Sequence, residues 1–297
     1  MRDVGQVLVI AAINGTIYAL FAVSVALVFR GARTVNFAQG EVGTLSLFIA
    51  WGIVTDRGLP WLLGAVVAIA FAALVGVVFE RLIVRRLERA DRATVAVATV
   101  GLLSLLLALQ FQLFSASPRV LRGPIGGLGI ELFDIYVSWT QVLALGVVVV
   151  VAVALSRVLR RTDFGLGVLA AAQHTDAARL MGVPVNRVSM FVWGAGAGLA
   201  ALAALLVVPS VGVFAPGFAT ELYLRGIVAA VLGGLASPLG AIAGGYALAV
   251  LESSTRRVFL HSTLPGLEYI VVLVVVLVVL VVRPTGLLAS ARTRGAA

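Results

Sequence analysis

The strongest constraint on this chain is a series of long stretches that contain no charged residue. A helix needs about 20 residues to cross the roughly 30 Å hydrocarbon core of a bilayer. Of the 297 residues, 61% are hydrophobic and 12% are charged, so most side chains need lipid rather than water around them. The stretches long enough to span are Val4–Phe29, Gly58–Phe79, Ala93–Pro118, Ile135–Ser156, Val188–Thr220 and Gly226–Leu251.

Two shorter apolar runs, Val42–Thr55 and Tyr269–Val282, reach spanning length only if a flanking residue such as Glu41 enters the membrane. With them, the sequence predicts an all-α, polytopic transmembrane bundle of about eight spans, some of them broken or re-entrant. We expect a single transmembrane domain over residues 1–297. Val4–Phe29 lacks the flanking features of a signal peptide, so we interpret it as a permanent span.

The net charge of +9 comes from 22 basic residues, all of them arginine. No soluble segment interleaves them with aromatic residues, so they indicate membrane orientation rather than nucleic-acid binding. Two loops concentrate them, one at 81–92 and one at about 157–189, and both are predicted to be cytoplasmic. Arg283, Arg292 and Arg294 predict a cytoplasmic C-terminus. The glycine-rich, charge-balanced segment at 115–134 is expected to be an outer loop rather than a folded domain.

After an external loop near Pro209–Phe218, the chain must cross the membrane an odd number of times to reach that C-terminus. Three crossings fit helices at Arg225–Leu235, Leu239–Leu251 and Leu267–Val282. One crossing fits if Gly226–Leu251 is a re-entrant hairpin. The sequence leaves both alternatives open.

Residue types exclude several kinds of active site. The chain has no lysine, so it cannot carry the P-loop lysine of an ATP-binding site. It has no cysteine, which removes disulfides and thiolate chemistry. His174 and His261 lie far apart, so we expect no metal site, and no nucleophile is paired with a base. We therefore expect neither enzyme activity nor a cofactor in this chain.

A first polar break, at 36–41, precedes the apolar run that begins at Val42. Polar groups at membrane depth are costly unless they face the bundle interior or a water-filled path. A helix that begins near Gly40 would place free amides and the Glu41 carboxylate at such a path. The alternative is that Glu41 only caps this helix at the cytoplasmic interface. The candidate pathway residues here are Asn36, Phe37, Gln39, Gly40 and Glu41.

Glycine and proline interrupt the apolar sequence again, at 214–221 and at 233–240. Such interruptions free backbone amides and carbonyls, which are tolerated only against protein or water, so they also indicate a translocation path. The further candidates from these breaks are Glu221, Gly233, Gly234 and Ser237.

The loop at about 157–189 contains a short predicted helix. Thr175 is expected to cap it, and Gly182 and Pro184 to end it. Leu180 and Met181 would form an apolar patch in a wet loop, which is typical of a docking surface. The alternative is a helix folded back on the membrane bundle. The candidate docking residues are Thr175, Asp176, Ala177, Ala178, Arg179, Leu180, Met181 and Gly182.

Four segments follow one another along nearly the whole chain: NGTIYAL at Asn14–Leu20, VNFAQGE at Val35–Glu41, AARLMGV at Ala177–Val183, and AVLGG at Ala230–Gly234, with Ser237, Gly240, Gly244 and Gly245 after it. Together they resemble the LivH-type permease subunits of branched-chain amino acid ABC importers. One departure is Gln39, where many members carry histidine, so a role for a titratable ring there does not transfer.

The resemblance implies a pore of two permease chains, like or unlike, in the cell inner membrane. It also implies cytoplasmic ATP-binding subunits, which bind the ATP, and an extracytoplasmic solute-binding protein. Asp176–Gly182 would be the coupling helix seated on the ATPase. Relatives move branched-chain amino acids, urea, short amides or other amino acids. The competing function is an ion-coupled secondary transporter that uses Glu41, Glu221 or Glu252.

Overall fold

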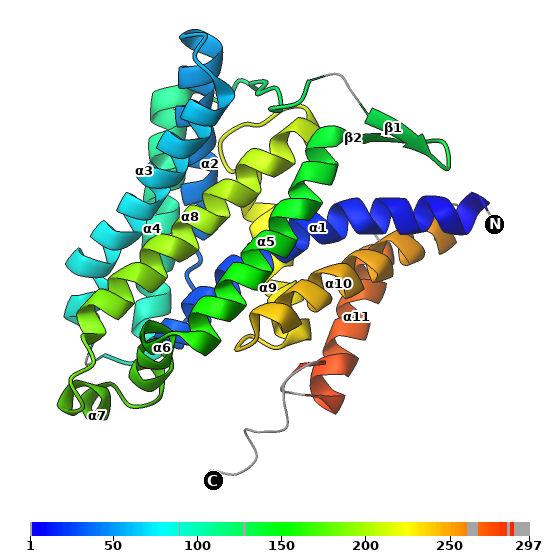
Figure 1. Cartoon of the computed structure of the whole chain (residues 1–297). Coiled ribbons are helices and arrows are strands. Elements are labelled where there is room, and N and C mark those ends of the chain that lie inside the picture. Colours follow the sequence, from blue (N-terminus) through cyan, green and yellow to red (C-terminus); the bar gives the residue numbers. More distant parts are fainter. Residues whose placement is uncertain (1, 89, 127–128, 260–266, 284–285, 288–297) are drawn as a thin grey trace.

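A computed structural model describes residues 2–88, 90–126, 129–259, 267–283 and 286–287 (Figure 1). They form the predicted helical bundle. His261, Arg292 and Arg294 lie outside the described residues. The elements are α1 (Arg2–Ala32), α2 (Gln39–Trp51), η1 (Gly52–Asp56), α3 (Trp61–Leu82), η2 (Val84–Leu87), α4 (Arg92–Phe114), β1 (Gly129–Leu132), β2 (Ile135–Ser138), α5 (Trp139–Arg161), α6 (Asp163–Gln173), α7 (Thr175–Leu180), α8 (Val185–Val211), α9 (Phe218–Gly233), α10 (Pro238–Val258) and α11 (Leu267–Val282).

Judged by helix length and composition, fewer helices can cross a membrane than the eight spans predicted. Among the described helices, five are long and apolar enough to span a bilayer, or six if the bent pair α9 and α10 counts as one span. The count of about eight is therefore not confirmed. The difference arises because α2 has only 13 residues before its π-helical extension η1, and α11 has 16.

The two ends of the bundle are distinguished by its arginine-rich loops, and we call the end that carries them the arginine-rich end. α1 runs from the strands to α6, so its last turn lies at this end (Figure 1). There Arg30 donates to the carbonyl of Ala236 at 3.3 Å, which places the α9–α10 turn at the same end. Leu287 N donates to the Leu232 carbonyl at 2.8 Å, so the chain after α11 returns there too. The positive-inside rule predicts that this end faces the cytoplasm, which would place the start of α1 on the outer side.

The core of the bundle is built on small residues, as the glycine and alanine content of the spans predicts. α8 is the most buried candidate span: 78% of the residues in its 18-residue apolar window are buried. The corresponding shares are 33%, 22% and 28% for the spans of α3, α4 and α5. A Cβ at Gly76 of α3 would overlap the carbonyl of Trp193 in α8. In a membrane, the hydrophobic effect does not drive helices together, because lipid tails are as apolar as the side chains. Close packing between backbones is therefore one of the interactions that join the helices.

The chain reverses between α9 and α10, whose axes are bent by 114°. Gly234 adopts φ +107°, the Ser237 hydroxyl accepts from Gly240 N at 3.0 Å, and Pro238 begins α10. A Cβ at Gly233 would overlap the carbonyl of Gly240, so the two helices meet backbone to backbone. Both predicted alternatives, three crossings or a re-entrant hairpin, contain this reversal. α9 and α10 are longer than the helices predicted at Arg225–Leu235 and Leu239–Leu251.

The outer loop contains secondary structure that the sequence analysis missed. β1 and β2 pair antiparallel, with Gly129 opposite Ser138, around a turn in which Phe133 and Asp134 have positive φ. Ser138 then starts α5 through a capping box with Gln141. The expectation of a loop without a folded domain holds, but the fold is not purely helical, because this hairpin belongs to it.

The backbone contact between α9 and α10 gives a first prediction. Gly244→Val would push a side chain into the carbonyl of Ala229, whereas a Cβ at Gly146 of α5 meets nothing within 4 Å. Overpacking typically costs about 1–3 kcal/mol, so we expect Gly244→Val to lower Tm in detergent and Gly146→Val to leave it nearly unchanged. Equal melting temperatures for the two variants would contradict the packing described above.

Candidate functional site

The first polar break forms a short loop that is anchored on both sides. α2 begins at Gln39, close to the predicted Gly40, and Glu41 lies in its first turn. The Asn36 side chain accepts from Ala38 N at 3.0 Å, and Phe37 N donates to the hydroxyl of Thr99 in α4 at 3.1 Å. The backbone amides freed by the break therefore find partners inside the protein, as membrane depth requires.

Glu41 is fully buried and holds three helices together. Gln110 of α4 donates to its carboxylate at 2.8 Å, and the hydroxyl of Thr220 in α9 also donates to it. The Gln110 carbonyl in turn accepts from Gly217 N at 3.3 Å. Gln110 is one turn from the end of α4 opposite the arginine-rich loops, so Glu41 is buried inside the bundle and away from the arginine-rich end. This position does not fit the alternative in which Glu41 caps α2 at the cytoplasmic interface.

Gln39 lies two residues before Glu41, and its side chain contacts Tyr223 of α9. The Tyr223 hydroxyl lies 2.6 Å from Gln39 Oε1 and 2.7 Å from the Asn36 carbonyl. Gln39 Nε2 is buried without a partner, and a half-turn of the amide would let it donate to Tyr223 while Tyr223 donates to Asn36. A Cβ at Gly196 would come within 2.8 Å of that nitrogen, so Gly196 makes room for the amide.

The structure gathers only part of the predicted pathway set. Gly40 packs against Tyr223 and Thr220, so the residues of the first break and the start of α9 form one cluster. Gly233, Gly234 and Ser237 lie instead at the α9–α10 turn at the arginine-rich end. Glu221 points away from the cluster, with 74% of its side chain exposed.

Five cluster members were missed by sequence reasoning: Thr44, Thr99, Gln110, Thr220 and Tyr223. A signal for two of them was present. Thr99 and Gln110 are polar residues in an otherwise uncharged span, and their spacing of 11 residues is about three helical turns, which places them on one face of α4.

The predicted docking helix is present as α7, with differences at its start. Thr175 does not cap it; its hydroxyl donates back to the carbonyl of Ala171 in α6 at 3.0 Å, and His174 occupies the N-cap. Gly182, at φ +83°, ends the helix as predicted. Leu180 and Met181 are 91% and 86% exposed, so they are not folded back on the bundle.

One face of α7 is nevertheless fixed to the bundle. Ala178 is buried, and its carbonyl accepts from Val183 N at 3.0 Å. Arg179 forms an ion pair with Glu88, between α3 and α4, and this hydrogen bond raises the pKa of Arg179 above its ordinary value. Ala177 is exposed, and the Asp176 side chain is 97% exposed.

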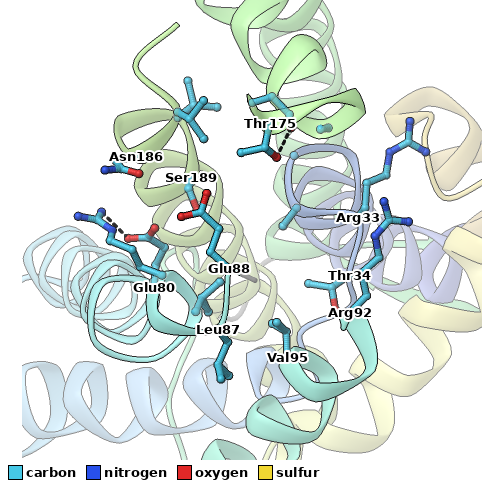
Figure 2. A pocket seen from close by; sticks show the side chains of 18 of the residues that line it. Arg33, Thr34, Glu80, Leu87, Glu88, Arg92, Val95, Thr175, Asn186 and Ser189 are labelled. Carbon is cyan, nitrogen blue, oxygen red and sulfur yellow. Dashed lines mark hydrogen bonds and ion pairs between the residues drawn. The ribbon is translucent and has the colours of Figure 1, made fainter. Parts of the chain in front are cut away.

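A cavity of about 300 Å³ lies beside Glu88, between the end of α1, the α3–α4 loop, α6 and the start of α8 (Figure 2). Charged and polar side chains line it, among them Arg33, Glu80, Glu88, Arg92, Thr175 and Ser189. Thr175 is the one α7 residue in this lining, so the cavity lies next to the start of the helix.

The buried cluster gives a second prediction. Gln110→Leu removes the donor to Glu41 and the acceptor for Gly217 N. Leaving buried hydrogen-bonding groups without partners typically costs about 1–3 kcal/mol each, so we expect a clear fall in Tm. Gln112→Leu, the same change on an exposed face of α4, is the matched control and should leave Tm nearly unchanged. A Gln110→Leu protein as stable as this control would show that the network is not required.

Comparisons with known proteins agree with this architecture. The family model for the permease component of the branched-chain amino acid transport system matches residues 7–281. The high-affinity branched-chain amino acid transport system permease protein BraD of Pseudomonas aeruginosa is 29% identical over 288 residues, and the alignment covers 92% of each chain. LivH of Escherichia coli, a permease protein of the same description, is 29% identical over 291 residues with the same coverage.

A further relative has a different named cargo: the autoinducer 2 import system permease protein LsrC of Yersinia pseudotuberculosis is 26% identical over 84% of this chain and 66% of its own length. No solved structure matches the chain. The family model covers nearly all of the bundle, from the start of α1 to the end of α11. The chain is a multi-pass membrane protein that belongs to the family of branched-chain amino acid transport system permease components.

Proposed function

We propose that this chain is the permease subunit of an ABC importer that moves branched-chain or related amino acids across the cell inner membrane, with ATP hydrolysed by partner subunits. The names of BraD and LivH support the cargo class, and their bacterial hosts support the location. LsrC carries a different cargo by name, so relatives of one fold serve several solutes. Urea or a short amide is the alternative cargo.

The observation that carries this proposal is the exposure of Leu180 and Met181 at the arginine-rich end. Two large apolar side chains on a six-residue helix are costly in water, and they have no cover within the described residues. A groove on a cytoplasmic ATP-binding subunit would bury them. The absence of lysine from the sequence makes a P-loop in this chain impossible, so the ATP belongs to that partner.

The anchors of α7 supply a route for mechanical coupling. A push on Leu180 and Met181 passes through Arg179 to Glu88 and hence to the ends of α3 and α4. It also passes through α6 and the start of α8. A second permease chain and an external solute-binding protein complete the transporter in this proposal.

Reconstitution tests the function directly. We expect the chain, co-purified with its ATP-binding subunits and second permease, to take up leucine into proteoliposomes only when ATP and the solute-binding protein are present. Uptake driven by an ion gradient without the ATP-binding subunits would contradict the proposal and support the secondary transporter.

The docking helix gives a third prediction. A carboxylate at an apolar interface costs several kcal/mol unless it is paired. We therefore expect Leu180→Asp or Met181→Asp to abolish co-purification of the ATP-binding subunits while the chain remains in the membrane. Val120→Asp, at a residue that is 51% exposed on the outer side, is the control and should leave the complex intact. Retention of the subunits by the α7 variants would contradict the docking role.

The ion pair at the base of α7 gives a fourth prediction. Arg179→Glu places two carboxylates together and should lower both uptake and its coupling to ATP hydrolysis. Glu88→Arg in the same chain restores opposite charges, so the double variant should recover most of the lost uptake. Because both groups are partly exposed, the effect should weaken as salt rises. A double variant no better than Arg179→Glu would show that the pair transmits nothing.

A further inference from the structure

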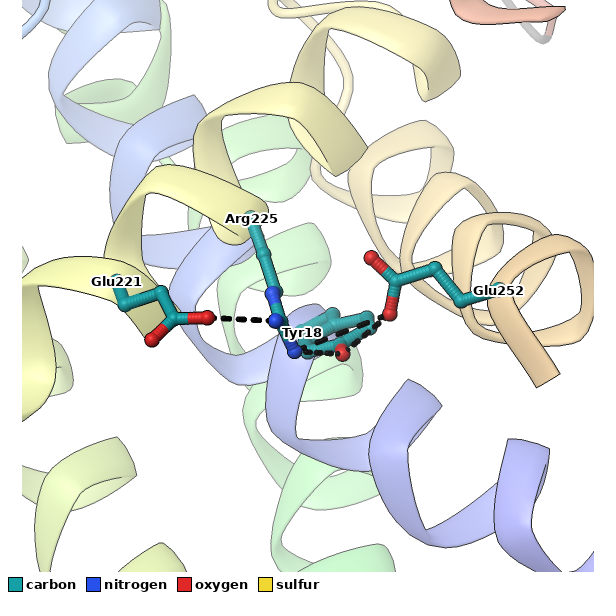
Figure 3. Close-up of polar contacts among 4 residues, drawn as sticks. All are labelled: Tyr18, Glu221, Arg225 and Glu252. Atoms are coloured by element: carbon teal, nitrogen blue, oxygen red, sulfur yellow. Dashed lines mark hydrogen bonds and ion pairs between the residues drawn. The ribbon is translucent and has the colours of Figure 1, made fainter. Parts of the chain in front are cut away.

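A second charged group lies outside the buried cluster, on α1, α9 and α10 (Figure 3). Arg225 of α9 lies between two carboxylates: its guanidinium is 2.6 Å from Glu221 and 3.9 Å from Glu252. The same guanidinium donates to the Tyr18 hydroxyl at 2.8 Å, and Tyr18 donates to Glu252 at 2.6 Å. Arg256 lines the same small cleft as Arg225 and Glu252, so two acids and two bases gather here.

These charges lie at half the depth of the bundle. Tyr18 is the middle residue of the 29-residue candidate span Val4–Ala32. Arg225 is near the middle of α9, far from either end of the helix. Ionised side chains at this depth are costly unless they face protein or a water-filled path, and they mark solute or ion pathways.

The group is open on one side. Tyr269 and Val272 of α11 close the side of Glu252, leaving a cleft of only about 10 Å³. On the other side, the Glu221 side chain is 74% exposed and Leu224 is 49% exposed. Glu221, Leu224, Arg225 and Val228 are spaced as neighbours on one face of α9. Within the described residues this face is open at Glu221 and Leu224, while the Arg225 side chain is 24% exposed and Val228 is partly buried.

We propose that this face of α9 lines the translocation path and binds the passing solute as a zwitterionic, aliphatic amino acid, with its ammonium at Glu221 and its carboxylate at Arg225. The proposal rests on the function proposed above and adds the residues that contact the cargo. Leu224 and Val228 supply the apolar surface for the side chain.

Arg225 has partners besides Glu221, namely the Tyr18 hydroxyl and, at 3.9 Å, the Glu252 carboxylate. Glu221 can therefore exchange its ion pair with Arg225 for one with an ammonium while Arg225 stays in place. The Glu221 carboxylate is on the exposed side, where a cationic group can reach it. A guanidinium beside it can take the carboxylate of the same molecule through charge-assisted hydrogen bonds. A neutral solute such as urea would offer neither charge.

Because the chain contains no cysteine, accessibility can be measured without altering the background. In the complete transporter in vesicles, Leu224→Cys should react with a water-soluble, cationic thiol reagent roughly tenfold faster than Val150→Cys, because the reactive thiolate forms only where water reaches it. Val150 lies on α5 and is 67% exposed, so it is a matched apolar control. Leucine with ATP should slow the labelling of Leu224→Cys. Labelling no faster than the control, as expected for burial against the second permease chain, would overturn the proposal.

Charge removal gives the second arm. Glu221→Gln should lower leucine uptake by roughly tenfold, the loss of one charge-assisted contact, while Tm is kept. Glu131→Gln, on the exposed β1 strand, is the control. Wild-type uptake by Glu221→Gln would overturn the assignment of Glu221. If the wild-type complex shows no ATP-dependent uptake, the proposed function itself fails, and labelling of Leu224→Cys still reports whether the face is lined by water.

Discussion

The requirement that every polar group at membrane depth be satisfied within the protein underlies this structure. Three breaks in helical structure, before α2, before α9 and between α9 and α10, free backbone amides that lipid cannot bond. Asn36, Thr99 and Gln110 accept from the amides at the first two breaks, and Ser237 accepts from Gly240 N at the third. The same side chains join α2, α4 and α9, so the bonds that make the breaks tolerable also set the positions of these helices.

Packing and polarity divide the bundle into regions with different roles. α3, α4 and α5 expose apolar faces, which suits contact with lipid or a neighbouring chain. α8 is buried and rich in glycine and alanine, so the other helices can pack closely around it at the centre of the bundle. The group of Tyr18, Glu221, Arg225 and Glu252 lies on α1, α9 and α10, and the exposed Leu180 and Met181 lie at α7. In the proposed function, solute handling and energy input would therefore belong to separate parts of one chain, connected through the packed helices.

The sequence predicted what depends on local pattern and missed what depends on tertiary partners. Uncharged runs revealed the helical bundle, and the break at 36–41 located the start of α2, because both follow from transfer between water and lipid. The exposed Leu180 and Met181 followed from an apolar pair in a wet loop. Hydropathy could not show that Glu41 is buried against Gln110 or that Gly233 lies far from Glu41, since each depends on residues remote in sequence. It also could not show that Thr175 bonds back to Ala171, because hydropathy does not report the partner of a hydroxyl.

The backbone contact between α9 and α10 has a mechanical consequence. Where Gly233, Gly240 and Gly244 meet main chain directly, no side chains interdigitate that could change rotamer and let one helix slide past the other. A Cβ at Gly245 would likewise come within 2.7 Å of the backbone nitrogen of Ala19 in α1. These three helices are therefore expected to tilt together as one rigid unit. The charged side chains that they carry would move with this unit, so one tilt would change their access from both sides of the membrane.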